Sequence, residues 1–217
     1  MKDIDGIEYY SPREEKINII SHAIGFILSI VALILLSTHA NRHGNIWHVV
    51  SFNIFGVSLI VLYAASTLYH SAKKPELRRR LRIIDHASIY VLIAGTYTPF
   101  TLVTLNGPIG WTIFGISWGL ALTGIVLKLF FTGKYELIST LMYVFMGWII
   151  VFAVKPLVNS LSSDGLLWLA AGGMAYTVGA ILYSIRKIKF NHAIFHILVL
   201  IGSACHFFSV FFYVLPY

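Results

Sequence analysis

Long apolar runs dominate the chain, and short polar segments separate them. A helix needs about 20 predominantly apolar residues to cross the hydrocarbon core of a bilayer. Seven runs reach that length, at 18–39, 47–70, 83–105, 109–130, 137–157, 165–185 and 192–214. They are continuously apolar rather than alternating, which favours helices over the strands of a membrane barrel. The pattern therefore predicts an all-α, integral membrane bundle of seven transmembrane helices, forming a single domain over residues 1–217.

Composition supports the membrane assignment. Of 217 residues, 58% are hydrophobic and 12% are charged, about half the charged share of a soluble domain. The mean hydropathy is +0.79. A soluble domain with this composition would expose large apolar patches, so a soluble enzyme, a disordered tail and a secreted disulfide scaffold are excluded. The single cysteine, Cys205, also excludes a metal site built from cysteines.

The basic residues predict which side of the membrane each loop faces. A net charge of +7 would indicate nucleic acid in a soluble chain, but here the position of each charge matters more, and no nucleic-acid partner is expected. Cytoplasmic loops of membrane proteins are enriched in Lys and Arg. With seven spans, the N-terminal segment and every second loop share one side. That side holds fourteen of the sixteen basic residues: Lys2, Arg13, Lys16, Lys73, Lys74, Arg78, Arg79, Arg80, Arg82, Lys128, Lys134, Arg186, Lys187 and Lys189.

The opposite side holds only Arg42 and Lys155. We therefore expect residues 1–17 to form a short cytoplasmic tail and the C-terminus to lie outside. The expected location is the inner (plasma) membrane.

Glycine spacing gives a weaker signal. Gly115 and Gly119 form a GxxxG pattern, and Gly172, Gly173 and Gly179 mark the sixth span. Such small residues favour close packing of membrane helices, so we expect contacts at these positions.

Ionisable and ligand-type side chains inside the spans gather at one depth. Asp85 is the acidic residue within a span, at the start of the third. His70 ends the second span, and His192 and His196 open the seventh. These span ends share the cytoplasmic side, and at 1.5 Å per residue the four side chains lie one to two turns deep. Ionisable groups at such a depth mark functional sites.

The histidines have a spacing that suits a metal ion. His192 and His196, at i and i+4, lie on one helix face about 6 Å apart. His70 would complete a set of three neutral nitrogen ligands with an open position, which favours a zinc ion as the cofactor. Asp85 would then hold a water molecule or act as general base. Ser66, one turn before His70, would orient a ligand or stabilise a developing oxyanion.

Simpler interpretations exist for each residue alone. Histidine pairs at i and i+4 are common at membrane interfaces, and His70 could cap the second helix. Asp85 could pair with Arg82 or stabilise the N-terminus of the third helix through the helix dipole. The coincidence of all four side chains at one depth favours the metal site.

The ordered motifs resemble a known family. Glu15-x-x-Asn18-x-x-Ser21-His22, Ser66-x-x-x-His70, Asp85 after a basic segment, and His192-x-x-x-His196 are similar to the hemolysin III group, within the progestin and adipoQ receptor family. That family includes the adiponectin receptors, and alkaline ceramidases have a similar arrangement. The resemblance covers essentially the whole chain. It implies zinc held by the three histidines, water held by Asp85, and supporting roles for Glu15, Asn18 and His22.

These observations lead to three functional hypotheses. The first is a zinc-dependent, hydrolase-like protein that acts on lipid amide or ester bonds at the cytoplasmic leaflet. The second is a non-enzymatic regulator or sensor of membrane lipid homeostasis with structural zinc. The third, implied by the family name, is a pore-forming cytolysin. Membrane lipids, including a substrate or ligand in the bundle, are the expected partners. A protein hormone is not expected, because the external loops have seven residues or fewer.

Overall fold

The computed structural model describes residues 2–4 and 7–215, with side chains from Tyr9 onward. Seven of its helical segments are long and apolar enough to cross a membrane. They are α1 (Pro12–His43), α2 (Ile46–Ser71), α3 (Pro75–Pro99) with η1 (Phe100–Leu105), α4 (Gly107–Phe131), α5 (Glu136–Gly147) with η2 (Ile149–Ala153) and α6 (Val154–Ser160), α7 (Ser163–Ser184), and α8 (Asn191–Ser209) with η3 (Val210–Val214). The predicted all-α membrane fold is confirmed.

Two helices begin earlier than hydropathy predicts. Helix α1 begins at Pro12 rather than 18, after Ser11, whose hydroxyl accepts a hydrogen bond from the Glu14 N–H at 3.3 Å. Helix α3 begins at Pro75 rather than 83. Proline is favoured at the first position of a helix, and polar residues continue these helices beyond the apolar run. Hydropathy therefore predicts the apolar part of each of these helices but not the polar turns that precede it.

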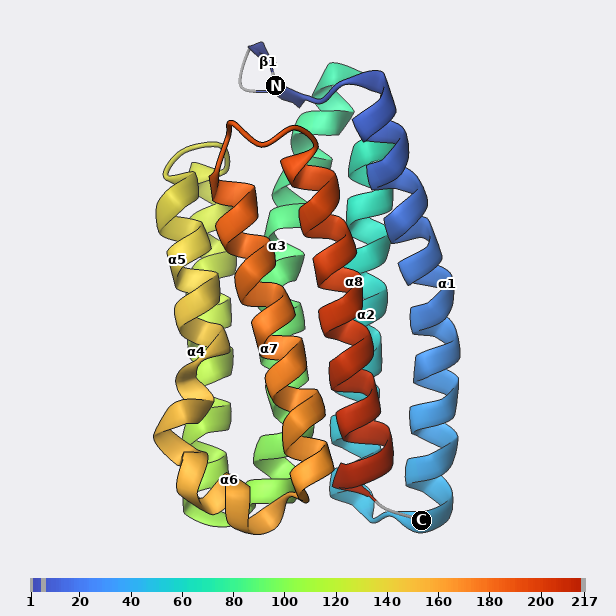
Figure 1. Cartoon of the computed structure of the whole chain (residues 1–217), viewed down its shortest axis with the longest axis vertical. Coiled ribbons are helices and arrows are strands. Elements are labelled where there is room, and N and C mark those ends of the chain that lie inside the picture. The colour runs from blue at the N-terminus through green and yellow to red at the C-terminus, as the bar shows by residue number, and fades with distance from the viewer. Residues whose placement is uncertain (1, 5–6, 216–217) are drawn as a thin grey trace.

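The N-terminal tail also contains a short hairpin. Strands β1 (Lys2–Ile4) and β2 (Ile7–Tyr9) pair antiparallel, with Lys2 opposite Tyr9. The expectation of a tail over 1–17 is thus corrected, because part of it is strand and residues from Pro12 onward are helix. The hairpin leads the chain across the end of the bundle into α1 (Figure 1).

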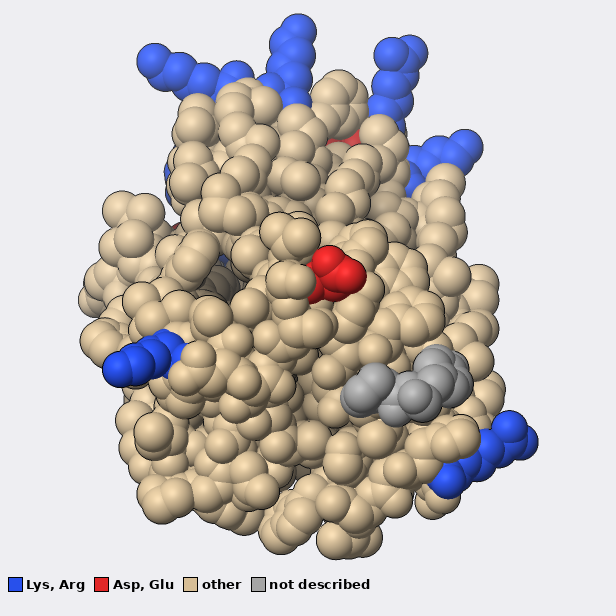
Figure 2. Space-filling model, turned by 60° about the horizontal axis from the view of Figure 1, so that its bottom comes forward, with Lys and Arg blue, Asp and Glu red and all other residues tan. Residues whose placement is uncertain are grey.

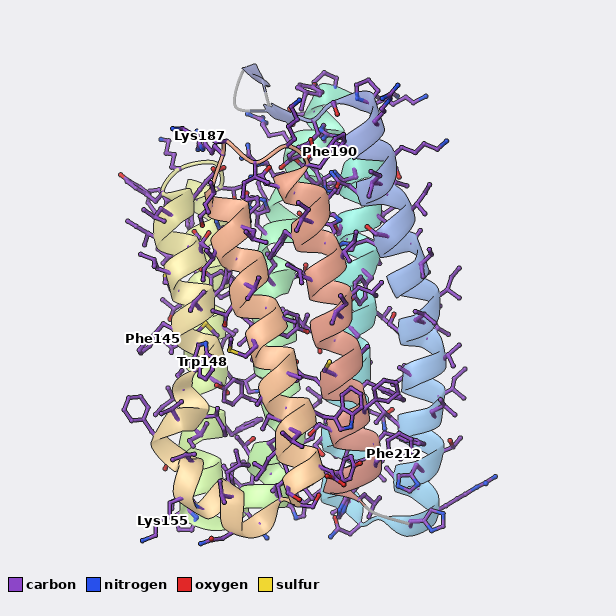
Figure 3. The ribbon with its side chains drawn as sticks, in the orientation of Figure 1. Phe145, Trp148, Lys155, Lys187, Phe190 and Phe212 are labelled. Atoms are coloured by element: carbon purple, nitrogen blue, oxygen red, sulfur yellow. The ribbon has the colours of Figure 1, made fainter. Side chains whose placement is uncertain are left out.

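The helices run roughly side by side, and the two termini lie at opposite ends of the bundle (Figure 1). Lys187 and Phe190 lie at the end that carries the N-terminus, whereas Lys155 lies at the other (Figure 3). The surface at this other end consists mostly of uncharged residues (Figure 2). We call the end with the N-terminus the N-terminal end. Its cytoplasmic orientation stays a prediction.

Many polar side chains are buried among the apolar core residues of the bundle, and many large apolar side chains are exposed on its outside. Helix α1 shows this clearly: Ile27 and Leu28 are exposed, whereas Asn18, His22 and Ser29 are buried. This distribution suits a surrounding hydrocarbon phase, in which buried polar groups need partners within the protein. The fold thereby collects histidine and carboxylate side chains inside the bundle.

Candidate metal centre

Three histidines from two helices meet at the N-terminal end. His70 lies in the last turn of α2, and His192 and His196 lie in the first two turns of α8. Although 122 positions separate His70 from His192, their Nε2 atoms lie 3.1 Å apart. The Nε2 atoms of His192 and His196 lie 2.9 Å apart. All three side chains are buried, and within the described part of the chain they are the one group of three whose ligand atoms suit a metal ion.

The other ring nitrogen of each histidine has its own partner. Nδ1 of His70 lies 2.9 Å from a carboxylate oxygen of Glu15, and Nδ1 of His196 lies 3.4 Å from the backbone carbonyl of Asn18. Both partners can only accept, so both Nδ1 atoms carry the proton. Nδ1 of His192 lies 3.1 Å from the hydroxyl of Tyr10.

These partners leave lone pairs directed at one point. His70 and His196, protonated at Nδ1, present unprotonated Nε2 atoms to Nε2 of His192. If Nε2 of His192 carried a proton, that single N–H could donate a good hydrogen bond to only one of the other two Nε2 atoms. A cation between the three nitrogens satisfies all of them at once, and a histidine whose second nitrogen donates to a carboxylate or carbonyl is typical of metal ligands.

The distances also suit zinc. Zinc–nitrogen bonds of about 2.0–2.1 Å at tetrahedral angles separate two ligand nitrogens by about 3.4 Å. The observed separations of 2.9 and 3.1 Å are within a few tenths of an ångström of that value. Small rotations of the imidazole rings would accommodate the ion, so the residues present fit the expected metal.

A buried ion pair stabilises the Glu15 carboxylate. The other oxygen of Glu15 pairs with the guanidinium of Arg78, whose side chain is 2% exposed. The same guanidinium donates to the backbone carbonyls of Tyr69 and His70, at 3.3 and 3.4 Å. Arg78 thus links α1, the C-terminal end of α2 and the first turn of α3 around one ligand-orienting carboxylate.

The remaining predicted site residues lie beside the histidines. The ring of His22 stacks on that of His196, with centroids 3.6 Å apart, and the Asn18 side chain is fully buried. Asp85 is buried, and the Ser66 side chain lies beside its carboxyl. The Ser66 hydroxyl makes no hydrogen bond of ordinary geometry to any described residue. The structure therefore brings all eight predicted residues together, while their roles remain to be tested.

Two of the three histidines, His192 and His196, line a cavity of about 370 Å³. Ser66, Asp85, His192 and His196 line it at the N-terminal end, and His206 lines it further along α8. Ten residues of α8 separate His196 from His206, which corresponds to roughly 15 Å along the helix. The cavity lining between these two histidines is mostly apolar. Cavities of this kind suit a small molecule or a lipid chain.

Two residues of this site, Tyr10 and Arg78, were not predicted from the sequence. Tyr10 stacks on His192 with ring centroids 4.4 Å apart, and nothing in its sequence context indicates that contact. Arg78 was assigned to a basic cytoplasmic loop. A helix starting at Pro75 would have shown Arg78, Arg82 and Asp85 at i, i+4 and i+7, on one face.

Comparison with known proteins assigns the sequence to a family. A family model described as haemolysin-III related matches residues 10–207, which include all eight predicted site residues. The chain belongs to the haemolysin-III-related family. The resemblance expected from the motifs is thereby confirmed.

Two bacterial relatives match this family member over nearly their whole length. Hemolysin-3 of Bacillus cereus is 52% identical over 204 residues, covering 94% of this chain and 93% of the relative. The hemolysin-3 homolog of Bacillus subtilis (strain 168) is also 52% identical, covering 94% and 96%. The human monocyte to macrophage differentiation factor is 29% identical over 203 residues, covering 91% and 83%. This haemolysin-III-related chain is a multi-pass membrane protein, and its bacterial relatives favour the plasma membrane.

Proposed function

We propose that this protein is a zinc-dependent hydrolase that cleaves an amide or ester bond of a lipid within the cytoplasmic leaflet. The observation that carries the proposal is the convergence of three histidine Nε2 atoms at a largely apolar cavity, which His192, His196 and Asp85 line. Imidazole nitrogens with an adjacent carboxylate are the groups that zinc hydrolases use.

His70, His192 and His196 would hold the zinc ion. When bound, zinc supplies Lewis-acid chemistry, which polarises a carbonyl group and makes water more acidic. Glu15, the Asn18 carbonyl and Tyr10 orient the three rings through their Nδ1 atoms. This orientation keeps the ligand lone pairs directed inward before the metal arrives.

Asp85 and Ser66 have complementary roles in the proposed reaction. The Asp85 carboxylate accepts a proton from the attacking water and returns it to the leaving amine or alcohol. The water oxygen forms a bond to the carbonyl carbon, and the carbon–nitrogen or carbon–oxygen bond of the lipid breaks. The Ser66 hydroxyl donates a hydrogen bond to the carbonyl oxygen as its negative charge develops.

The apolar cavity positions the acyl chain of the lipid. Its walls include residues of α5 and α7. The indole N–H of Trp148, the residue directly after α5, donates to the hydroxyl of Thr177 in α7 at 3.0 Å. Trp148 is 39% exposed and also lines the cavity, so the cavity reaches the surface of the bundle here. A chain entering between these two helices would reach the histidines without crossing the polar end of the bundle.

Product analysis of an Asp85→Asn variant tests the proposal. The purified, zinc-loaded protein in lipid nanodiscs is incubated with acyl amides and esters, and free fatty acid is measured by mass spectrometry. We expect Asp85→Asn to slow release about 100-fold or more, since general-base catalysis contributes about 10²–10⁴-fold. Asp164→Asn, in the first turn of α7, is the matched control and should retain activity.

Zinc-loaded wild type that releases no fatty acid from any amide or ester would overturn the hydrolase proposal. A stable zinc-containing protein without turnover would instead favour the lipid-sensor hypothesis. Equal rates for wild type and Asp85→Asn would exclude Asp85 from the reaction.

A further inference from the structure

The cavity contains a second charged group, away from the three histidines. Lys128 lies in the last turn of α4, is 3% exposed, and lines the same cavity. Its Nζ atom lies 6.0 Å from the centroid of the Tyr143 ring, and Glu136 is close enough to attract it electrostatically. Among the residues that the structure describes, this ammonium group makes no hydrogen bond or ion pair, although its Nζ atom is not one of the fully enclosed polar atoms.

A lysine near the end of a membrane helix normally extends to the aqueous interface. Lys128 instead points into the bundle, where a buried cation without a partner is destabilising. The dipole at the C-terminal end of α4 and the ring of Tyr143 offset only part of this cost. Such a residue in a cavity indicates a missing counter-ion.

The nearest carboxylate is already engaged. Glu136 accepts from Arg82 at 2.6 Å and from Arg186 at 3.3 Å. Glu136, which lines the cavity with Lys128, is thus shared between the buried Arg82 and the exposed Arg186, while Lys128 has only a longer-range electrostatic attraction to it. Lys128 therefore has no carboxylate of its own at hydrogen-bonding distance among the described residues.

The charged group lies near the candidate reaction centre. The hydroxyl of Tyr143, whose ring contacts Lys128, donates to the backbone carbonyl of His86 at 3.0 Å. His86 directly follows Asp85 in the chain and also lines the cavity. Lys128, His86 and Asp85 thus line the same cavity, whose other walls are mostly apolar.

We propose that Lys128 binds the anionic head group of an amphiphile, a carboxylate or a phosphate, whose acyl chain occupies the cavity. This inference deepens the proposed function by naming a substrate class: acyl amides or esters whose head group is negatively charged. Binding by Lys128 does not itself depend on hydrolysis, because the ammonium group and the apolar cavity suffice for it.

Two matched acyl amides test the inference. N-oleoylglycine carries a carboxylate, whereas N-oleoylethanolamine has the same chain and a neutral head group. Binding of each is measured by native mass spectrometry to the full-length, zinc-loaded Asp85→Asn protein, so that turnover does not interfere. We expect the anionic amide to bind about 10- to 100-fold more tightly, the range for hydrogen bonds to charged groups.

Variants of Lys128 identify the group responsible. Lys128→Gln should abolish the preference by weakening only the anionic amide, and Lys128→Arg should keep most of it. Lys134→Gln, which changes an exposed lysine just beyond α4, should have no effect. An unchanged preference in Lys128→Gln, with unaltered zinc content, would overturn the inference.

Two further measurements complete the test. The first distinguishes a lipid head group from a free anion, and the second distinguishes failure of this inference from failure of the proposed function. Inorganic phosphate that binds as tightly as N-oleoylglycine would show that the site takes a free anion, which contradicts the lipid assignment. If wild type shows the Lys128-dependent preference but cleaves neither amide nor the corresponding esters, the proposed function fails and this inference stands. If the protein cleaves the amides without any preference for the anionic one, the proposed function stands and this inference fails.

Discussion

At the scale of single residues, hydrogen-bond partners determine what the histidines can do. An imidazole can bind a metal only through an unprotonated nitrogen. The Glu15 carboxylate and the Asn18 carbonyl hold protons on the outer nitrogens of His70 and His196. The inner nitrogens are therefore free to bind an ion. Glu15 and Asn18 thus help to determine whether the histidines can bind a metal.

Replacing Glu15 tests this arrangement. Glu15→Gln removes the charge that orients His70 and leaves Arg78 without its carboxylate, so zinc affinity should fall about 10- to 100-fold. Competition with a chromophoric chelator measures the affinity. Glu76→Gln, which alters an exposed carboxylate paired with Arg79 and Arg80, should bind zinc like the wild type. Equal affinity in Glu15→Gln would show that the carboxylate does not support the site.

Part of the site is predictable from sequence because depth follows from counting residues along helices. His70, Asp85 and His192 are assigned to one layer by span boundaries and helical rise alone. Tyr10 and Lys128 are not, because their burial depends on how the N-terminal segment crosses the bundle and how α4 is rotated. Hydropathy carries no information about either.

At the scale of helices, packing depends on where glycine lets another side chain approach. A Cβ at Gly25 of α1 would lie 2.5 Å from the ring of Tyr63, whose hydroxyl donates to Ser203 at 2.8 Å. By contrast, apart from the glycine's chain neighbours and the backbone of its own helix, no atom of the described residues lies within 4 Å of a Cβ built at Gly115 or Gly119. The GxxxG pattern was therefore wrong as a prediction of packing within this chain, because spacing alone does not reveal which helix face meets a neighbour.

Two glycine substitutions should have opposite effects. Gly25→Ala forces the Tyr63 ring from its place and should destabilise the fold by about 1–3 kcal/mol. Gly119→Ala has open space and should stabilise its helix by about 0.5–1 kcal/mol. Thermal unfolding in detergent measures both. Similar melting temperatures for the two variants would contradict the packing described for α1 and α2.

At the scale of the whole molecule, seven spans put the termini on opposite sides of the membrane, as Figure 1 shows for the two ends of the bundle. The fold class and all seven spans were predictable, because the bilayer sets a minimum length for an apolar helix. The extensions of α1 and α3 were not, since they lie outside the hydrocarbon layer.

Reporter fusions test the predicted orientation. With fourteen of sixteen basic residues on one side, a fluorescent protein fused at the N-terminus should fluoresce in the cytoplasm. Alkaline phosphatase fused at the C-terminus should be active outside it. The reverse pattern would place the histidines in the outer leaflet and contradict the proposed access from the cytoplasmic side.

The metal content of the purified protein tests the central claim most directly. Wild type, His192→Ala and His43→Ala are purified without a histidine tag, and zinc is measured by inductively coupled plasma mass spectrometry. We predict near-stoichiometric zinc in wild type and in His43→Ala, whose histidine is exposed at the other end of α1. His192→Ala should lose it, because this residue lies between the other two ligands. Zinc-free wild type, or equal zinc in all three proteins, would contradict the account.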